Sequence, residues 1–204
     1  MVAQNRLLVF LKAPRLGFVK TRIAATLGDV AALAAYREIV AAVLDPLRDL
    51  PGVELRFTPD DAPAEVRAWQ RASWVLAPQG SGDLGERLAR AFAEQFMSGA
   101  RKVIVVGADC PAMSPTDLGA ALDALDEDDL VLGPATDGGY WLIGLRAPRP
   151  WLFRGIAWST PSVFAQTESK ARMAGLRVAR LRELSDIDTE ADWRRWQENR
   201  RAES

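Results

Sequence analysis

The sequence contains no histidine and a single cysteine, and these absences exclude several classes of enzyme. Without an imidazole there is no Ser-His-Asp or Cys-His catalysis and no His-ligated zinc. One cysteine, Cys110, can form neither an internal disulfide nor a cysteine zinc site, and it fits a reducing compartment. A resident metal ion must therefore be held by oxygen ligands, which favours Mg²⁺ or Mn²⁺.

Long apolar runs and an excess of basic charge are also missing. No apolar run reaches the length of a membrane span, and the N-terminus lacks the pattern of a signal peptide, so we expect a cytoplasmic protein without a membrane partner. The net charge of −1 argues against a nucleic-acid partner. The length of 204 residues suits a single domain, 1–204, whose 49% apolar residues can fill one core.

Short apolar runs alternate with helical segments along the chain, which predicts an α/β fold. Strands are expected at 7–11, 53–57, 74–77, 103–106, 130–132, 140–145 and 176–181, with helices between most of them. The pattern predicts three layers, α/β/α, around a mostly parallel sheet, with an antiparallel excursion where 130–132 and 140–145 follow closely. Ligands of such sheets bind beyond the carboxyl ends of the strands, so the loops after Leu11, Val106 and Leu181 are the expected site.

The loop after the first expected strand is rich in cations. It carries Lys12, Gly17, Lys20 and Arg22, and no acidic residue precedes Asp29. Gly17 allows backbone N–H groups to turn toward a ligand, while Lys20 and Arg22 supply charge where a helix begins, which suits a phosphate. The spacing differs from that of a Walker A loop, where glycine, lysine and a hydroxyl residue are adjacent. The alternative is a solvated basic loop.

The segment 80–85 matches the dinucleotide fingerprint G-x-G-x-x-G and precedes an expected helix. A phosphate-binding unit already opens the chain, however, and the strand before this segment is weak. Asp109, which follows the next strand, stands in a small-residue turn that is more typical of a metal ligand than of a ribose clamp. A Rossmann oxidoreductase is therefore a minor alternative, beside a plain flexible loop.

Carboxylates follow two of the expected strands. Asp109 comes after 103–106, and Asp186 and Asp188 come after 176–181. Mg²⁺ commonly takes one or two carboxylates together with phosphates and water, so we predict that Asp109 and Asp188 share one Mg²⁺ or Mn²⁺. We expect the two carboxylates to repel each other until a metal ion lies between them. A turn role for Asp109 and a helix-cap role for Asp188 are the alternatives.

A further segment combines an acid, two glycines and aromatic residues. Asp137, Gly138 and Gly139 precede Tyr140 and Trp141, and Trp158 follows later. The glycines permit close approach of a sugar or base, on which the rings could stack while Asp137 accepts hydrogen bonds from hydroxyl groups. The alternative is a hairpin with aromatic residues in the core. Cys110 is expected to be a small buried residue beside the site.

Six segments along the chain form a recognisable set: 12–22, Gly82-Asp-Leu-Gly-Glu-Arg87, Gly107-Ala-Asp-Cys-Pro111, Gly133-Pro with 137–141, Trp158-Ser-Thr160 and Asp186-Ile-Asp-Thr189. In this order they resemble a bacterial family of GT-A-like transferases of poorly defined function. The family is often labelled glycosyltransferase, of the arsenosugar-biosynthesis type, and is similar to the guanylyltransferases that make phospholactate and molybdenum-cofactor derivatives. The resemblance spans about residues 6 to 193.

The resemblance implies a nucleotide-diphospho-sugar transferase fold and places Lys20 and Arg22 on the phosphate loop. It places Asp109 and Asp188 at the metal, and it makes the segment with Gly82 and Asp83 a loop beside the nucleotide. Many GT-A glycosyltransferases carry Asp-x-Asp at the metal turn, whereas Asp109 stands alone before Cys110. A lone aspartate with a distant partner is more typical of nucleotidyltransferases.

The expected function is metal-dependent nucleotidyl transfer from a nucleoside triphosphate to a phosphorylated small molecule, with Lys20, Arg22 and Asp109 in catalytic roles. The alternative is a glycosyltransferase that uses a nucleotide-sugar donor, with Asp137 as its base. A dinucleotide oxidoreductase or an inactive nucleotide sensor is a third option. The base, the acceptor and the choice of metal stay open, as does the oligomeric state, with a homodimer as one option.

Overall fold

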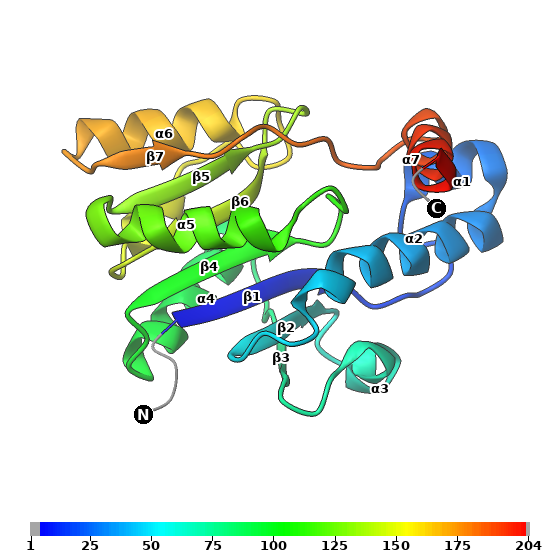
Figure 1. Cartoon of the computed structure of the whole chain (residues 1–204), viewed down its shortest axis with the longest axis horizontal. Helices are drawn as coiled ribbons and strands as arrows, with labels where there is room; N and C mark the ends of the chain where they lie inside the picture. Colours follow the sequence, from blue (N-terminus) through cyan, green and yellow to red (C-terminus); the bar gives the residue numbers. More distant parts are fainter. Residues whose placement is uncertain (1–4, 203–204) are drawn as a thin grey trace.

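A computed structural model describes residues 5–202, and within them one seven-stranded sheet forms the centre, in the order β3-β2-β1-β4-β6-β5-β7. Strand β6 runs antiparallel to both β4 and β5, and the other neighbouring strands are parallel. The predicted parallel sheet with an antiparallel excursion is therefore confirmed (Figure 1). The strands are β1 (Asn5–Lys12), β2 (Val53–Thr58), β3 (Val75–Pro78), β4 (Lys102–Gly107), β5 (Leu130–Pro134), β6 (Tyr140–Leu145) and β7 (Val178–Arg180).

Helices cover both faces of the sheet. They are α1 (Thr21–Leu27), α2 (Asp29–Leu44), α3 (Pro63–Val66), α4 (Leu84–Met97), α5 (Pro115–Glu127), α6 (Val163–Met173) and α7 (Glu190–Ala202), with short 3₁₀ turns at Asp45–Leu47, Arg67–Trp69 and Pro150–Phe153. Among these described helices, none combines the length and the apolar character that a membrane crossing requires.

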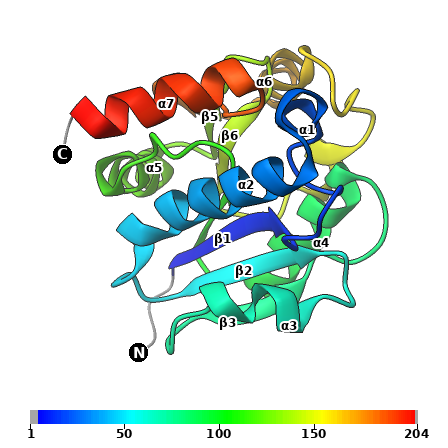
Figure 2. The same ribbon diagram turned by 90° about the vertical axis from the view of Figure 1, so that its right-hand side faces the viewer.

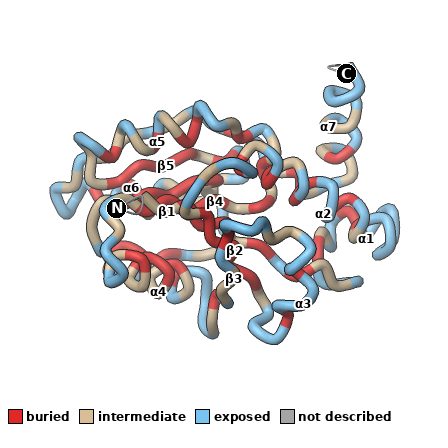
Figure 3. Tube along the Cα trace, turned by 60° about the horizontal axis from the view of Figure 1, so that its bottom comes forward, coloured by how far each residue is buried: buried red, intermediate tan, exposed pale blue. Residues whose placement is uncertain are grey.

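Alternation along the strands sorts the side chains into two cores. Leu7, Val9 and Leu11 of β1 pack on one face with α2 and α5, whereas Leu8 packs on the other face with α4 and α6. Figure 3 shows the buried strands between exposed outer surfaces of helices. The predicted three-layer α/β/α architecture is thus confirmed, and both faces of the sheet supply the hydrophobic stabilisation.

A smaller cluster joins α1, α2 and α7 beside the sheet (Figure 2). Ile23 of α1 and Trp193 of α7 are among its buried residues. The segment 181–189, between β7 and α7, crosses the carboxyl edge of the sheet to reach this cluster (Figure 1). On the way, the Ile187 N–H donates to the Asp109 carbonyl oxygen at 3.0 Å. This crossing brings the late aspartates to the turn after β4.

Candidate active site

Lys20 ends the loop after β1 in an unusual conformation. Its φ of 47° and ψ of 49° are left-handed, which is uncommon for a residue other than glycine. The residue precedes α1 directly, and its side chain is only 4% exposed. A residue held in this strained region is pinned by its surroundings, and such residues cluster at functional sites.

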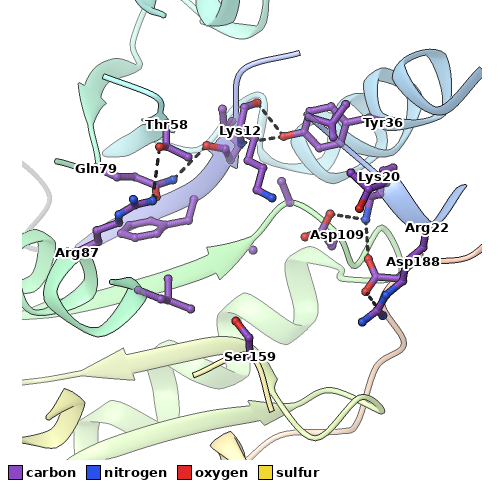
Figure 4. Close-up of a pocket in the computed structure, with 17 residues that line it drawn as sticks. Lys12, Lys20, Arg22, Tyr36, Thr58, Gln79, Arg87, Asp109, Ser159 and Asp188 are labelled. Atoms are coloured by element: carbon purple, nitrogen blue, oxygen red, sulfur yellow. Dashed lines mark hydrogen bonds and ion pairs between the residues drawn. The ribbon is translucent and has the colours of Figure 1, made fainter. Parts of the chain in front are cut away.

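The ammonium group of Lys20 contacts two carboxylates from distant parts of the chain. Its Nζ lies 2.5 Å from Asp109 Oδ1 and 3.1 Å from Asp188 Oδ1, and Arg22 Nη1 lies 3.3 Å from Asp188 Oδ2 (Figure 4). Burial lowers the pKa of Lys20, but the charges and hydrogen bonds of Asp109 and Asp188 more than offset this, so the pKa is raised. The lysine is therefore charged at neutral pH. The structure brings Lys20, Arg22, Asp109 and Asp188 into one constellation.

One expectation about these carboxylates is wrong. The sequence suggested that Asp109 and Asp188 would repel each other until a metal ion came between them. The Lys20 ammonium already lies between them and neutralises part of their charge. The repulsion was overestimated because Lys20 lies 89 residues before Asp109 in the sequence, and only the tertiary structure brings the two side chains together.

A cavity of about 550 Å³ opens beside this constellation. Four cationic side chains and two carboxylates take part in its lining, together with apolar and hydroxyl groups. The charged residues are Lys12, Lys20, Arg22, Arg87, Asp109 and Asp188. A cavity of this size lies within the range of roughly 300–1,000 Å³ that is typical of small-molecule sites.

The wall formed by β2, β3 and α4 carries polar residues that sequence reasoning missed. Gln79 is buried, and its Nε2 donates to the carbonyl oxygens of Leu11 at 3.1 Å and Arg56 at 2.9 Å. Arg87 donates from Nε to the Gly82 carbonyl oxygen at 2.9 Å and from Nη1 to Thr58 Oγ1 at 3.5 Å. Arg87 belongs to the Gly82–Arg87 segment and could have been singled out there. Thr58 and Gln79 carry no such signal except their place after strands.

Ser159 lines the cavity on the side that faces Lys12 and Tyr36 (Figure 4). Its φ of 63° is again left-handed. Its neighbours are fixed: Thr160 Oγ1 donates to the Ala157 carbonyl oxygen at 2.7 Å, and the Trp158 ring meets Tyr140 edge-on at a centroid distance of 6.5 Å. The Trp158-Ser-Thr160 segment thus supplies a wall of the site, in which Trp158 packs and Ser159 faces the cavity.

The glycines of segment 80–85 serve local packing. Asp83 caps α4, because its Oδ1 accepts from the Glu86 N–H at 2.9 Å while Glu86 Oε2 accepts from the Asp83 N–H at 2.9 Å. A Cβ at Gly82 would collide with Glu86, and one at Gly85 would lie 2.6 Å from Trp158 Nε1. Gly17, Gly82 and Asp83 do not line the cavity.

Asp137, Gly138 and Gly139 also lie outside the cavity lining. Asp137 Oδ1 accepts from the Gly139 N–H at 2.8 Å, so the carboxylate closes its own turn. Gly138 has a φ of 87°, and its carbonyl oxygen accepts from the Phe164 N–H at 2.9 Å. The turn thereby supports the segment that carries Ser159.

Asp186 is not part of the cavity lining, and the Cys110 thiol donates to its Oδ1 at 2.5 Å. Burial raises the pKa of Asp186 from 3.8 to about 6, the thiol hydrogen bond opposes this, and the charges of Asp137, Asp109 and Asp188 add to the rise. Burial also raises the pKa of the Cys110 thiol. The cysteine is therefore a small buried partner of Asp186, and its raised pKa keeps the thiol protonated.

We expect Asp186→Asn to stabilise the protein at neutral pH and not at acidic pH. Because the folded-state pKa of Asp186 is raised, the wild type loses stability as pH rises from about 4 to about 6, where the buried carboxyl ionises. Above that window the free energy of unfolding of the variant should exceed that of the wild type by on the order of 1–2 kcal/mol, and below about pH 4 this difference should vanish. Thermal melting across pH with EDTA present measures this, and a gain that does not depend on pH would contradict it.

Comparisons with known proteins identify the chain as a nucleotide-using transferase, in agreement with its fold. The chain belongs to the family DUF2064, described as an uncharacterized protein conserved in bacteria, which matches residues 46–160. It is also 31% identical over 144 residues to a phosphoenolpyruvate guanylyltransferase of Chloroflexus aggregans, with 68% of this chain and 71% of that relative covered.

Two solved structures extend the comparison. A Desulfovibrio desulfuricans G20 protein, provisionally classed as a nucleotide-diphospho-sugar transferase, is 35% identical with a TM-score of 0.87, over 92% of this chain and 84% of that chain. Rv0371C of Mycobacterium tuberculosis H37Rv, solved in complex with manganese, is 18% identical with a TM-score of 0.56, over 97% of this chain and all of that chain (100%). The second likeness shows the fold alone. Together with the sequence relative, these matches confirm the predicted transferase family and its fold.

Proposed function

We propose that the protein transfers a nucleotidyl group from a nucleoside triphosphate to a phosphorylated small molecule, with the help of a divalent metal ion. The observation that carries the proposal is the pair Asp109 and Asp188, which contact one ammonium group at the edge of a strongly cationic cavity. Carboxylates from two separate segments, without an Asp-x-Asp turn, are more typical of nucleotidyl than of glycosyl transfer. The guanylyltransferase relative supports the same class.

The carboxylate geometry fits a divalent cation. Lys20 Nζ lies within 3.1 Å of both Asp109 and Asp188, so a cation near this point can contact both carboxylates at once. Within residues 5–202 there is no cluster of three or more acidic, cysteine or histidine side chains that could hold a metal, so phosphates and water would complete the shell. When bound, the ion would supply charge neutralisation at the reacting phosphate.

The cationic side chains would bind the anionic parts of the two substrates. Lys20 and Arg22 lie at one end of the cavity beside the carboxylates, where they would hold the triphosphate through charge-assisted hydrogen bonds. Arg87 lies on the wall with Thr58 and is placed to hold a second anion. Ser159 faces the same space from the other side, and its hydroxyl group would help to orient the acceptor.

Nucleotidyl transfer also suits the side chains that are absent. A phosphorylated acceptor is already ionised at neutral pH, so its attack on the α-phosphate needs no general base. The chain offers no histidine for that role. The protein would instead align the two substrates in the cavity and stabilise the charge that develops on the departing pyrophosphate.

Glycosyl transfer is the second candidate, favoured by the likeness to the Desulfovibrio protein. An acceptor hydroxyl would then need a base, and Asp137 is the residue that the sequence offered. Its carboxylate closes its own turn away from the cavity lining, which weakens this candidate.

The two candidates release different products, and this decides between them. We expect pyrophosphate to appear when the protein is incubated with Mg²⁺, a nucleoside triphosphate and phosphoenolpyruvate or 2-phospholactate. A thermal-shift screen of nucleotides first selects the base, because a ligand at a hundred times its Kd adds ~2.7 kcal/mol of stability. The shift should depend on Mg²⁺ and disappear in EDTA. Release of a nucleoside diphosphate from a nucleotide-sugar, without pyrophosphate from any triphosphate, would establish glycosyl transfer instead.

We further expect no binding of NADH or NADPH at millimolar concentration. The space beside the glycines of segment 80–85 is filled by the side chains of Arg90, Glu86 and Trp158. The segment therefore leaves no backbone cradle for a pyrophosphate. NADH fluorescence titration is the measurement, with Gly82→Val as the comparison. A clear signal that the substitution removes would restore the dinucleotide interpretation.

A further inference from the structure

The position between Asp109 and Asp188 is already taken by a charge of the protein itself. Lys20 Nζ approaches Asp109 Oδ1 at 2.5 Å and Asp188 Oδ1 at 3.1 Å, and the lysine side chain is 4% exposed. The two carboxylates are open to the cavity, with 48% and 37% of their side chains exposed. The lysine therefore approaches from the protein side and the carboxylates face solvent.

We propose that Lys20 is a built-in counter-ion that holds the cation position between Asp109 and Asp188, and that nucleotide phosphates draw it away and admit the metal ion. This inference rests on the metal and nucleotide site of the proposed function. It goes beyond that function in assigning an order: the metal binds weakly to the free protein and tightly to the protein with nucleotide.

Electrostatics makes the two cations mutually exclusive. A divalent ion that touched both carboxylates would lie almost in contact with an ammonium group at the observed Lys20 position, and like charges at such short distance repel strongly. The ammonium group must move before the metal binds. It is nearly buried, so it needs a new anionic partner, and the phosphates of a nucleotide in the adjoining cavity provide one.

The placement of Lys20 in the backbone supports this role. The residue stands where the loop after β1 meets α1, with φ at 47° and without a side-chain cap. Arg22, on the first turn of α1, contacts Asp188 alone and is 71% exposed. Lys12 lines the same cavity, and its side chain has no ion pair with Asp109 or Asp188. Of the four cations from Lys12 to Arg22, Lys20 is the one that bridges the two carboxylates, whereas Arg15 pairs with Asp61 and Glu65.

Coupling between the two ligands follows from the exchange of partners. If nucleotide raises the affinity for metal by some factor, metal must raise the affinity for nucleotide by the same factor. Removal of the ammonium should raise the affinity for metal in the absence of nucleotide. It should also shrink the coupling factor, because no counter-ion then has to be displaced.

Equilibrium dialysis with Mn²⁺ tests the proposal without a measurement of activity. The full chain is dialysed against Mn²⁺ alone and against Mn²⁺ with GTP, and the metal retained by the protein is counted. In Lys20→Met we expect the affinity for Mn²⁺ alone to rise by about tenfold or more, since a charge next to the metal is removed. Lys20→Gln keeps a polar head group and should behave likewise, which guards against one variant failing to fold.

Lys12→Met is the matched control, because it removes the same charge from the same cavity without freeing the carboxylates. An affinity for Mn²⁺ alone that is unchanged or lower in both Lys20 variants overturns the proposal. An equal rise in the Mn²⁺ affinity of Lys12→Met also overturns it, since the effect would then come from the overall positive charge of the cavity and not from the Lys20 position. If wild type retains no Mn²⁺ with GTP or with any triphosphate selected by the thermal screen, the proposed metal-dependent function fails instead.

Discussion

Replacing Asp109 by asparagine is expected to abolish metal-dependent nucleotide binding and to lower transfer by about a hundredfold or more. The substitution keeps the size of the side chain and removes its charge. Of the two carboxylates, Asp109 lies closer to the cation position, because its Oδ1 is 2.5 Å from Lys20 Nζ and that of Asp188 is 3.1 Å away. The charge of Asp109 would therefore be the main anchor of a metal ion there. Calorimetric titration of nucleotide with and without Mg²⁺ measures the binding, and pyrophosphate release measures the transfer.

The variant should remain folded, which makes a loss of binding interpretable. Asp109 is 48% exposed, and Lys20 keeps its contact with Asp188. We expect the free energy of unfolding to fall by about 1 kcal/mol, because the nearly buried Lys20 ammonium loses one of its two partners, and that partner is a half-exposed carboxylate. A gain in stability, as bare carboxylate repulsion would give, would show that Lys20 does not neutralise the pair.

Two further substitutions frame this result. Asp188→Asn should act in the same sense, and Asp186 is a poor replacement because its carboxylate accepts a hydrogen bond from the Cys110 thiol and does not line the cavity. Asp61→Asn is the matched control: its carboxylate is 75% exposed and pairs with Arg15 outside the cavity lining, so binding should stay near wild type. If Asp109→Asn kept full metal-dependent nucleotide binding, the proposal of a metal site made by Asp109 and Asp188 would be wrong.

Most of the fold could be predicted from the sequence because its signals are local. Apolar runs such as 103–106 and 140–145 are interior strands, and β6 has the bounds expected from its sequence. Ser114 caps the N-terminus of α5, since its side chain accepts from the Asp117 N–H, and a serine before Pro115 is a local signal for the start of a helix. The short strand β7, Val178–Arg180, covers only part of the expected 176–181, because pairing with β5 at the sheet edge determines its length.

The neighbourhood of the site was also predictable, whereas the contacts within it were not. Carboxyl ends of parallel strands share one edge, which places Asp109 near the loop that contains Lys20. The partner of that lysine depends on a left-handed backbone at Lys20 and on the crossing of segment 181–189, and neither is visible in local sequence. Asp137 stays outside the cavity lining, because a side-chain turn of purely local origin uses its carboxylate.

Gly138 shows how a glycine outside the cavity can still support its wall. The residue has a φ of 87°, and a Cβ added there would collide with the backbone of Pro161. Its carbonyl oxygen accepts from the Phe164 N–H, so the turn and the segment behind Ser159 are in direct backbone contact. A side chain at this position must therefore displace the segment that carries Ser159.

We accordingly expect Gly138→Ala to lower the free energy of unfolding by about 2–4 kcal/mol, the sum of left-handed strain and overpacking. Transfer to the acceptor should fall further than nucleotide binding does, because Lys20 and Arg22 lie on the other side of the cavity from Ser159. Denaturant unfolding and nucleotide calorimetry on the same variant separate the two effects.

Gly155→Ala supplies the matched control for this prediction. Gly155 also has a positive φ, 66°, but a Cβ there meets nothing within 4 Å, so the variant carries the strain without the collision. It should lose only about 1 kcal/mol and keep acceptor transfer, because the wall need not move. Equal losses in the two variants would mean that the close approach of Gly138 to Pro161 adds nothing to stability. A parallel loss of nucleotide binding in Gly138→Ala would mean that Ser159 and the phosphate-binding side of the cavity are not separate parts of the site.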